Sequence, residues 1–387
     1  MEKNKWWLKK PCIIATHVKP DEDVIVAVAL LKMAGVKIEG YWFRGEGDEA
    51  LPPQFQFKNI LWVDRGRQVF DHHGIAGKTS AQLVAEELGI ADEKWLQPIL
   101  AHVRRADLEG RSEPMDLNDM LKAIARELDD DLKIMELGVR IATAIIEFHR
   151  RNMKRDNEKA AMIIKEFFGD ETEMPERIRR YYQLLQNPKF VRPCDFAELA
   201  TANPELAKEV LKFIKADIIK YQIAEEEVNK AQKIKVGSYF IFAGRSDNPK
   251  FNVRCREKGA AIVIQRNSDG HVQIFFNNKI LTPQLIENIT EDLIEILRLR
   301  EISLDPSRRL VIRKNELRTA ERVGEIPEWY LFKGERGGRL ILNGSLTAPN
   351  VPPTKIPFEE IVEFATDVLQ HYQRGAPSHP REKRPRK

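Results

Sequence analysis

Three short apolar runs in the first part of the chain are each followed directly by histidine or carboxylate side chains. The runs cover residues 12–15, 61–63 and 68–70, and their length is typical of short buried strands. The side chains that follow them are His17, Asp21, Asp23, Asp64, Asp71, His72 and His73. Ligands of open α/β sheets gather beyond the carboxyl ends of the strands. The pattern therefore favours an α/β fold in which three strand ends bring these groups to one edge of a sheet.

The chemistry of this set of side chains indicates a divalent cation. Mn²⁺ suits a mixture of imidazoles and carboxylates best, with Mg²⁺ or Zn²⁺ as alternatives. A His-His pair in a loop is usually only solvated, and an H-x-x-x-D-x-D match such as residues 17–23 often arises by chance. The occurrence of three motifs in this order, each after an apolar run, favours the metal site over that simpler interpretation.

The same motifs resemble those of the DHH phosphoesterase superfamily. This superfamily includes RecJ-like exonucleases, family II inorganic pyrophosphatases, oligoribonucleases and cyclic-dinucleotide phosphodiesterases. Residues 16–23 match its first motif, Asp64 the second and residues 71–73 the third. Residues 80–88 are similar to the helix that follows the third motif, and Asp107 is the candidate for the fourth. The resemblance covers roughly the first 110 residues of the chain.

The resemblance implies a centre of two metal ions, with Mn²⁺ as the expected cofactor and Mg²⁺ as the alternative. One ion would be bound by His17 and Asp21, the other by Asp23, His72 and Asp107, and Asp64 would bridge both. In the same scheme His73 would face the substrate phosphate, and Asp71 would orient a metal ligand. Two cations about 4 Å apart can activate a hydroxide and stabilise the attacking and leaving oxygens of a phosphoryl centre.

Four arginines are candidate substrate contacts, because a guanidinium fork matches phosphate oxygens. They are Arg65, Arg104, Arg105 and Arg254. Taken one at a time, each is more often a solvated surface charge.

The connection between the second and third motifs departs from the usual family pattern. Only seven residues separate Asp64 from His72, whereas a parallel crossover needs about a dozen or more. Residues 65–67 therefore predict a hairpin turn, with the runs 61–63 and 68–70 antiparallel. A short connection of this kind is similar to the Myg-type branch of DHH-like exonucleases, although that branch has a different first motif.

The chain is expected to be of the α/β class and to divide into four segments. These are a DHH-type metal-binding catalytic domain (1–115), a helical region (116–234), a C-terminal α+β substrate-gripping domain (235–375) and a disordered basic tail (376–387). In the enzymes that this chain resembles, such a C-terminal domain closes over the metals. Their usual Gly-Gly-His motif is missing here, and residues 337–339 and 343–345 are the nearest candidates.

Hydrophobic periodicity predicts the main elements of these segments. The predicted helices are 23–34, 79–88, 92–105 with Asp92 as N-cap and a restart at Pro98, 116–128, 132–168, 283–297 and 357–372. The later predicted strands are 37–43, 238–243, 260–265, 271–276, 310–312 and 339–342. A turn at residues 267–270 should join two of these strands.

Composition narrows the class of protein. The net charge of +4 over 387 residues is compatible with nucleic-acid binding without requiring it. The basic stretch 149–155 could contact a nucleic-acid backbone, but an exposed helix face is the favoured interpretation. Three widely spaced cysteines are typical of a reducing compartment. With no secretory signal and no apolar segment of membrane length, we expect a cytoplasmic protein without membrane contact.

These features together predict a metal-dependent phosphoesterase that cleaves a phosphoester bond with a two-metal-activated hydroxide. Its substrate would be a nucleotide or a short single-stranded nucleic acid, cleaved by an exonuclease-type reaction; cyclic dinucleotides and pyrophosphate stay open. The alternative is a catalytically inactive DHH-fold protein that binds nucleotides or nucleic acid. A third hypothesis is nucleic-acid binding through the helical region.

Overall fold

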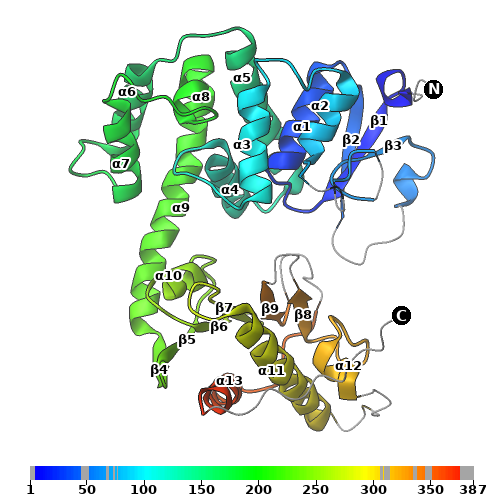
Figure 1. Ribbon diagram of the computed structural model, residues 1–387, viewed down its shortest axis with the longest axis vertical. Coiled ribbons are helices and arrows are strands. Elements are labelled where there is room, and N and C mark those ends of the chain that lie inside the picture. The colour runs from blue at the N-terminus through cyan, green and yellow to red at the C-terminus, as the bar shows by residue number, and fades with distance from the viewer. Residues whose placement is uncertain are drawn as a thin grey trace. The chain divides into compact units, whose positions relative to one another are not determined.

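The computed structural model describes residues 5–44, 52–66, 69–72, 75, 77–305, 308, 314–333, 338–344 and 351–374. The chain divides into two compact units, Met1–Ile218 and Ile219–Lys387 (Figure 1). Each unit combines one sheet with several helices, which confirms the mixed α/β class. No helix in the described part of the chain is both long and apolar enough to cross a membrane.

The sheet of the first unit has three parallel strands in the order β2-β1-β3. Its strands are β1 (Cys12–His17), β2 (Ile38–Arg44) and β3 (Ile60–Trp62), which confirms the predicted strands at 12–15, 37–43 and 61–63. Residues alternate between the two faces of β1: Ile14 joins the main core of the unit, whereas Ile13 and Ala15 pack with Trp42 on the other face. Because β1 is the central strand, its carboxyl end lies between the ends of its two neighbours.

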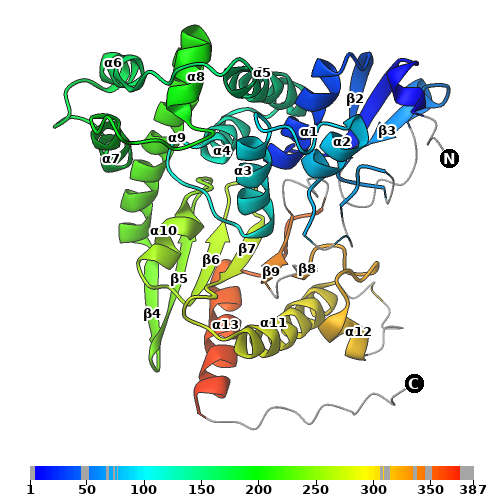
Figure 2. The same cartoon turned by 45° about the horizontal axis from the view of Figure 1, so that its top comes forward.

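Helix α1 (Glu22–Met33) follows β1 and is buried on almost every side. Asp21 caps its first turn by accepting a hydrogen bond from the Val24 amide at 3.2 Å, and Gly35 follows its end with φ +84°. The helix lies between the sheet and α5 (Asp131–Arg150), as Figures 1 and 2 show. It approaches α5 closely at Gly138, where an added Cβ would lie 2.6 Å from the Cδ1 of Ile25. The helix that carries the first motif is therefore held rigidly inside the unit.

Two further helices complete the surroundings of the motifs. Helix α2 (Ser80–Leu88) begins after the N-cap Thr79 and ends at Gly89 in the left-handed conformation, as predicted. Helix α3 (Gln97–Leu108) begins five residues later than the predicted N-cap Asp92. The N-cap prediction was wrong because Pro98 fits only the first turn of a helix, so the helix starts immediately before it.

The connection after β3 is not the predicted antiparallel hairpin. Val63 and Phe70 form an isolated bridge of the parallel type, and the Asp64 amide donates to the Phe70 carbonyl at 2.9 Å. Asp64 and Gly66 have φ values of +59° and +86°, so two left-handed residues turn the chain within a short distance. Antiparallel pairing was expected because the connection between Val63 and Phe70 is too short for the crossover that joins two parallel strands. A single parallel bridge can form without such a crossover. The predicted strand residue Gln68 lies outside the described residues.

The helices after residue 116 belong to the same core as the sheet. They are α4 (Leu117–Glu127), α5, α6 (Asn157–Phe168), α7 (Glu176–Leu185), α8 (Phe196–Ala202) and α9 (Pro204–Lys230). Apolar side chains from residues 7 to 218 form one continuous cluster, so the predicted boundary at residue 115 falls inside it. The predicted continuous helix 132–168 is interrupted after Arg150, where Asn152 adopts φ +49°. Helix α9 continues past Ile218 into the second unit.

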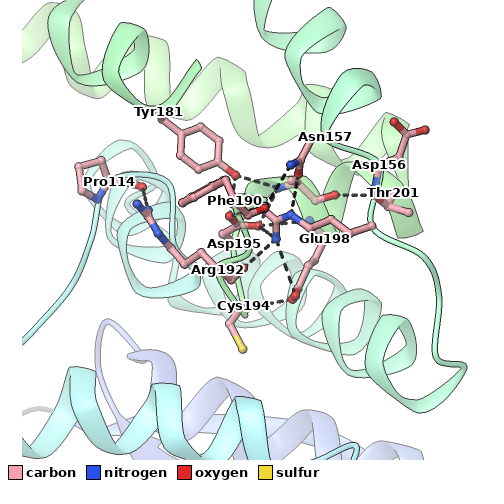
Figure 3. A network of polar contacts seen from close by, with 12 residues as sticks. Pro114, Asp156, Asn157, Tyr181, Phe190, Arg192, Cys194, Asp195, Glu198 and Thr201 are labelled. Carbon is pink, nitrogen blue, oxygen red and sulfur yellow. Dashed lines mark hydrogen bonds and ion pairs between the residues drawn. The ribbon is translucent and has the colours of Figure 1, made fainter. Parts of the chain in front are cut away.

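A buried ion pair joins the helices of this region (Figure 3). Arg155 donates to both carboxylate oxygens of Asp195, at 2.8 and 2.6 Å, and Tyr181 Oη donates to the same carboxylate at 2.8 Å. Asp195 also caps α8 by accepting from the Ala197 amide at 3.0 Å. Since Asp195 is completely buried, these donors are the groups that compensate its charge. Part of the basic stretch 149–155 therefore serves the internal structure of the unit.

We expect Asp195→Ala to lower the free energy of unfolding by about 3–5 kcal/mol, because it removes the carboxylate that pairs with the largely buried Arg155 guanidinium. Urea unfolding followed by circular dichroism measures this change. Arg150→Ala is the control: Arg150 is exposed and pairs with Glu147 on its own helix, so its loss should cost less than about 0.5 kcal/mol. Equal effects of the two substitutions would contradict the assignment.

The second unit contains a six-stranded sheet in the order β4-β5-β6-β7-β9-β8. The strands are β4 (Gln232–Val236), β5 (Tyr239–Arg245), β6 (Ile262–Arg266), β7 (Val272–Phe276), β8 (Tyr330–Lys333) and β9 (Arg339–Leu342). The helices are α10 (Phe251–Glu257), α11 (Pro283–Leu304), α12 (Lys314–Thr319) and α13 (Phe358–Gln373). The four predicted strands corresponding to β5, β6, β7 and β9 are confirmed. The predicted strand 310–312 and the tail 376–387 lie outside the described residues.

The central strand β6 buries both of its faces. Ile262 and Ile264 pack into the core formed with α11 and α13, whereas Val263 packs with Phe251 of α10 on the opposite face. Strands β6 and β7 form the predicted hairpin, with Gly270 at φ +90° in its turn. The β5–β6 pair is parallel, so both of these strands end at the same edge of the sheet.

Candidate metal centre

The side chains predicted as metal ligands come from five places in the first unit. His17 is the last residue of β1, and Asp21 and Asp23 lie at the start of α1. Asp64 follows the short strand β3. His72 follows the Phe70 bridge, and Asp107 lies in the last turn of α3. The ends of two parallel strands and the start of one helix thus meet at one edge of the sheet, which is the edge expected for a ligand site.

Asp64 lies between two groups of ligand atoms. Its Oδ2 is 3.4 Å from His17 Nε2, and that imidazole is 3.8 Å from Asp21 Oδ1. Its Oδ1 is 2.9 Å from His72 Nε2. Both trios, His17–Asp21–Asp64 and Asp23–Asp64–His72, place their ligand atoms within 4.8 Å of one another. One carboxylate therefore serves two neighbouring clusters through its two different oxygens.

The second cluster includes two more carboxylates. His72 Nε2 lies 3.8 Å from Asp23 Oδ2 and 3.7 Å from Asp107 Oδ2. Asp107 comes from the end of α3, far along the chain from the other motifs. The structure thus brings all six predicted ligands together.

The backbone around Asp64 and Asp23 fixes both carboxylates. Asp64 adopts the left-handed conformation, which Asp and Asn tolerate better than most residues, and Ser80 Oγ donates to its Oδ1 at 3.1 Å. Asp23 accepts hydrogen bonds from the amides of Ser80 at 2.7 Å and Ala81 at 2.8 Å. These amides are at the N-terminus of α2, where the helix dipole favours negative charge. Ser80 therefore positions both carboxylates.

The electrostatics of the cluster reflect an excess of buried carboxylates. Burial, together with the nearby charges of Asp21 and Asp64, raises the pKa of Asp23 to about 8. Burial also acts to raise the pKa of Asp64, but hydrogen bonds from His17 and His72 outweigh it and lower the pKa below its usual value. Positive charge on the imidazoles is what allows Asp64 to stay ionised.

The two imidazoles show the complementary effect. Burial acts to lower the pKa of His17, but its contacts with Asp21 and Asp64 outweigh burial and raise the pKa to about 11. The hydrogen bond to Asp64 raises the pKa of His72 to about 9, against the effect of burial. In the protein alone, protons on the imidazoles supply the positive charge that the carboxylates demand. Divalent cations would supply the same charge, and carboxylate oxygens and imidazole nitrogens are ligands that Mn²⁺ accepts. The residues present therefore fit the metal that the motifs imply.

A second buried cluster lies against the first and was not predicted as a unit. His102 of α3 has its Nδ1 2.6 Å from Glu22 Oε1 of α1 and its Nε2 3.3 Å from Asp116 Oδ2. Burial acts to lower the pKa of His102, but the two carboxylates outweigh it and raise the pKa to about 9. Because Glu22 stands between Asp21 and Asp23 and His102 precedes Asp107 on α3, the contact holds these two ligand-bearing helices together.

The sequence contained a partial signal for this cluster. Glu22 lies inside the first motif between two ligands, and a histidine on a helix flank is most often structural, as His102 proves to be. Its partner Asp116 caps α4 by accepting from the Asp119 amide at 2.8 Å. No spacing rule links Glu22, His102 and Asp116, because they meet only through the packing of three helices.

We expect His102→Ala to lower the free energy of unfolding by about 3–5 kcal/mol, since Glu22 and Asp116 would be left buried without a counter-charge. Urea unfolding measures the loss, and hydrogen exchange of the α3 amides shows whether that helix loosens. Arg104→Ala on the same helix is the control: Arg104 is exposed, so the cost should stay below about 0.5 kcal/mol. A variant at residue 102 as stable as this control would rule out the structural role.

The candidate substrate residues differ in their surroundings. Arg104 lines a polar cavity of about 250 Å³ together with Lys78, Thr79 and Gln82 at the N-terminal end of α2. Arg65 and Arg105 are half-buried; Arg65 directly follows Asp64, and Arg105 lies two residues before Asp107. Among the four predicted arginines, Arg104 alone contributes to this cavity.

Arg254 belongs to the second unit and has other partners. Its guanidinium forms ion pairs with Glu225 and Glu257, and its Cζ lies 4.9 Å from the centroid of the Tyr221 ring. A phosphate would have to displace two carboxylates to reach it, so this arginine is better explained as a structural contact between α9 and α10. The predicted catalytic residue Asp71 is buried beside Phe70, and His73 lies outside the described residues.

A third group of possible metal ligands is His149, Cys194 and Glu198. The Glu198 Oε2 already accepts from the Cys194 amide at 2.8 Å (Figure 3). It also lies 2.9 Å from His149 Nε2. Burial raises the pKa of the Cys194 thiol well above its usual value, whereas metal binding needs the thiolate. These residues form part of the polar network around Asp195 and are poor metal ligands.

The basic residues of the helical region are largely engaged within the unit. Arg155 pairs with Asp195, and Arg177 pairs with Asp119 and lies 3.5 Å from Asp217. Tyr181 is buried against Asp195 rather than exposed for stacking. These contacts weaken the hypothesis that the helical region is a nucleic-acid interface.

Comparisons with known proteins leave the function to be argued from this geometry. No protein-family model and no curated protein matches the chain. Two solved structures show a remote likeness. An uncharacterized protein from Helicobacter pylori G27 aligns at 10% identity and a TM-score of 0.27, covering 94% of this chain and 100% of the other. CDC45 from Entamoeba histolytica aligns at 8% identity and a TM-score of 0.33, covering 93% and 96%. Likenesses at these TM-scores support no inference about function.

Proposed function

We propose that the protein is a divalent-metal-dependent phosphohydrolase of the phosphodiesterase or exonuclease type, with a DHH-type catalytic domain in its first unit. The observation that carries the proposal is the position of Asp64, whose two carboxylate oxygens each approach a different imidazole. A carboxylate shared by two neighbouring ligand clusters is the arrangement that a pair of cations requires. The same arrangement supports the resemblance to the DHH superfamily, because candidate ligands from each of the four matching motifs lie close to one another.

The ligand roles in this proposal follow the two clusters. His17 and Asp21 would hold one cation, while Asp64 would bridge to the second. The second cation would be held by Asp23, His72 and Asp107. Mn²⁺ is the proposed metal and Mg²⁺ the alternative, since both accept carboxylate oxygens and Mn²⁺ also accepts imidazole nitrogens.

The remaining side chains bind the substrate and keep the ligands in place. Bound cations would activate water and neutralise the charge that develops on phosphoryl oxygens. Arg104 would hold a non-reacting phosphate in the polar cavity beside α2, because its guanidinium can donate two parallel hydrogen bonds. Ser80 and the start of α2 keep Asp23 and Asp64 in a fixed position. For His73, a contact to the substrate phosphate stays a prediction.

A nucleotide or short single-stranded nucleic acid is the proposed substrate. Of the two cations that line the cavity beside α2, Lys78 pairs with Glu86 of the same cavity at 2.6 Å, so Arg104 would contact the phosphate next to the one that reacts, which an oligonucleotide or a cyclic dinucleotide has. The alternative, a protein that binds nucleotides without catalysis, would retain the fold with no need for two metals. Metal content therefore separates the two proposals.

We expect Asp64→Asn to abolish tight binding of both cations and to lower turnover at least about a hundredfold. Asparagine tolerates the left-handed backbone at this position, so the substitution removes charge without straining the turn. Metal analysis after dialysis against Mn²⁺ measures the first effect, with two ions per chain expected for the unaltered protein. Hydrolysis of short RNA, short DNA, cyclic dinucleotides and pyrophosphate with Mn²⁺ measures the second.

Asp129→Asn is the matched control, because it makes the same change at a fully exposed carboxylate of the same unit and should leave metal content and turnover unchanged. Two Mn²⁺ ions per chain and full turnover in Asp64→Asn would refute the metal centre. Two ions without turnover on any of the four substrates would refute this substrate range. No bound metal in the unaltered protein would favour the non-catalytic alternative.

We expect Arg104→Ala to raise KM for an oligonucleotide about tenfold while kcat changes little, because a contact to a non-reacting phosphate contributes equally to ground-state and transition-state binding. Steady-state kinetics on a short oligonucleotide and on pyrophosphate measures the effect. Since the guanidinium is exposed, the substitution should leave the unfolding transition unchanged. A fall in kcat with unchanged KM would instead place Arg104 at the reacting phosphate.

A further inference from the structure

The second unit contains a polar cavity at the ends of two parallel strands. Strands β5 and β6 are paired in parallel with Arg245 opposite Arg266, so both arginines leave the sheet at the same edge. The cavity has a volume of about 440 Å³, within the range of small-molecule sites. It is lined by Glu227, Arg245, Ser246, Asp247, Arg266, Asn267, Ser268 and Gly270. The carboxyl ends of adjacent parallel strands are the usual place for a ligand in a sheet of this kind.

Two guanidinium groups supply positive charge to this cavity. The Arg266 side chain forms no hydrogen bond or ion pair with the described residues, and it extends over the hairpin turn, where an added Cβ at Gly270 would lie 3.7 Å from its Nη2. Arg245 pairs with Glu359 at 3.3 Å, and its Cζ lies 5.3 Å from the centroid of the Phe358 ring. The ion pair is mostly exposed, so a ligand can replace it at little cost. Both forks are therefore able to bind an anion, and phosphate matches their geometry best.

Two carboxylates face the same cavity and are already held in place. Glu227 Oε2 accepts from Ser246 Oγ at 2.7 Å, and Asp247 Oδ1 accepts from the Ser268 amide at 2.7 Å. Each carboxylate still has acceptor sites for further donors. Hydroxyl groups are suitable donors for them, whereas a second phosphate would be repelled. The cavity thus combines anion-binding forks with acceptors for hydroxyls.

Hydrogen bonds hold the backbone next to the cavity in place. Buried Gln265 donates through Nε2 to the carbonyls of Ser246 at 2.9 Å and Asn248 at 3.1 Å. The Ser246 amide donates to the Arg266 carbonyl at 2.9 Å, and the Asn248 amide donates to Ser246 Oγ at 3.0 Å. These contacts fix the backbone between the two arginines, so the site is organised before any ligand binds.

We propose that this cavity binds a phosphorylated sugar, such as the ribose phosphate of a mononucleotide. The guanidinium groups of Arg245 and Arg266 would hold the phosphate, and the carboxylates of Glu227 and Asp247 would accept the sugar hydroxyls. Among the described residues that line the cavity there is no aromatic ring, so the proposed recognition is of the sugar phosphate and not of a stacked base. All of these residues belong to the second unit, so the inference does not depend on the metal centre or on the proposed function.

Isothermal titration of the full chain tests this proposal, with chelator present so that no divalent cation can recruit phosphate. The titrants are ribose 5-phosphate, inorganic phosphate, ribose and 5′-AMP. Ribose 5-phosphate should bind more tightly than phosphate or ribose alone. Arg266→Gln should raise its Kd at least about tenfold. If the site serves nucleotides, 5′-AMP will bind at least as tightly as ribose 5-phosphate; weaker binding assigns it to free sugar phosphates.

Two further variants separate the parts of the site, and a third is the control. Arg245→Gln should also weaken phosphate binding, and its exposed position makes a folding defect unimportant. Glu227→Gln should weaken ribose 5-phosphate relative to inorganic phosphate. Arg374→Gln makes the same charge change at an exposed position outside the cavity and should leave every Kd unchanged. Absence of binding at millimolar ligand, equal Kd values for phosphate and ribose 5-phosphate, or wild-type binding by Arg266→Gln and Arg245→Gln would each overturn the proposal.

Discussion

The first unit depends on the compensation of buried carboxylates at one edge of its sheet. Asp23 and Asp64 are almost completely buried, and each needs hydrogen-bond donors or positive charge to remain there. The start of α2 supplies donors to Asp23, and two imidazoles supply charge to Asp64. A fold stabilised only by apolar packing would gain nothing from this concentration of charge. Protons on the two imidazoles supply positive charge to these carboxylates, and divalent cations would supply the same charge.

Compensation of buried charge also explains the contacts of the cluster formed by Glu22, His102 and Asp116. Glu22, His102 and Asp116 form a second set of buried charges, which ties α1 to α3. Helix α1 is also fixed by the close approach of Ile25 to Gly138 on α5. The candidate ligands come from a strand end, two helices and a turn. Their distances from one another stay constant only if these elements do not move relative to one another. Rigid packing of α1 thus helps to keep the carboxylates and imidazoles of the candidate metal centre in position.

The sequence predicted which histidines and carboxylates lie close together better than it predicted the path of the chain between them. Apolar runs followed by polar groups define strand ends, and parallel strands place their ends together, so the gathering of His17, Asp21 and Asp64 could be expected. The pairing of Val63 with Phe70 could not, because its direction depends on two left-handed residues in a short turn. Contacts among charges on different helices, such as that of His102, likewise follow from tertiary packing and leave no periodic signal.

Charge patterns along the sequence were the least reliable guide, for a physical reason. An arginine has the same sequence signature whether it faces solvent, a ligand or a buried carboxylate. Arg155 and Arg254 are taken up by acidic partners, whereas Arg266 extends into a cavity without such a partner among the described residues. What distinguishes them is whether a carboxylate from another element reaches the guanidinium. Binding sites for anions are therefore better sought among cations that the fold leaves uncompensated than among runs of basic residues.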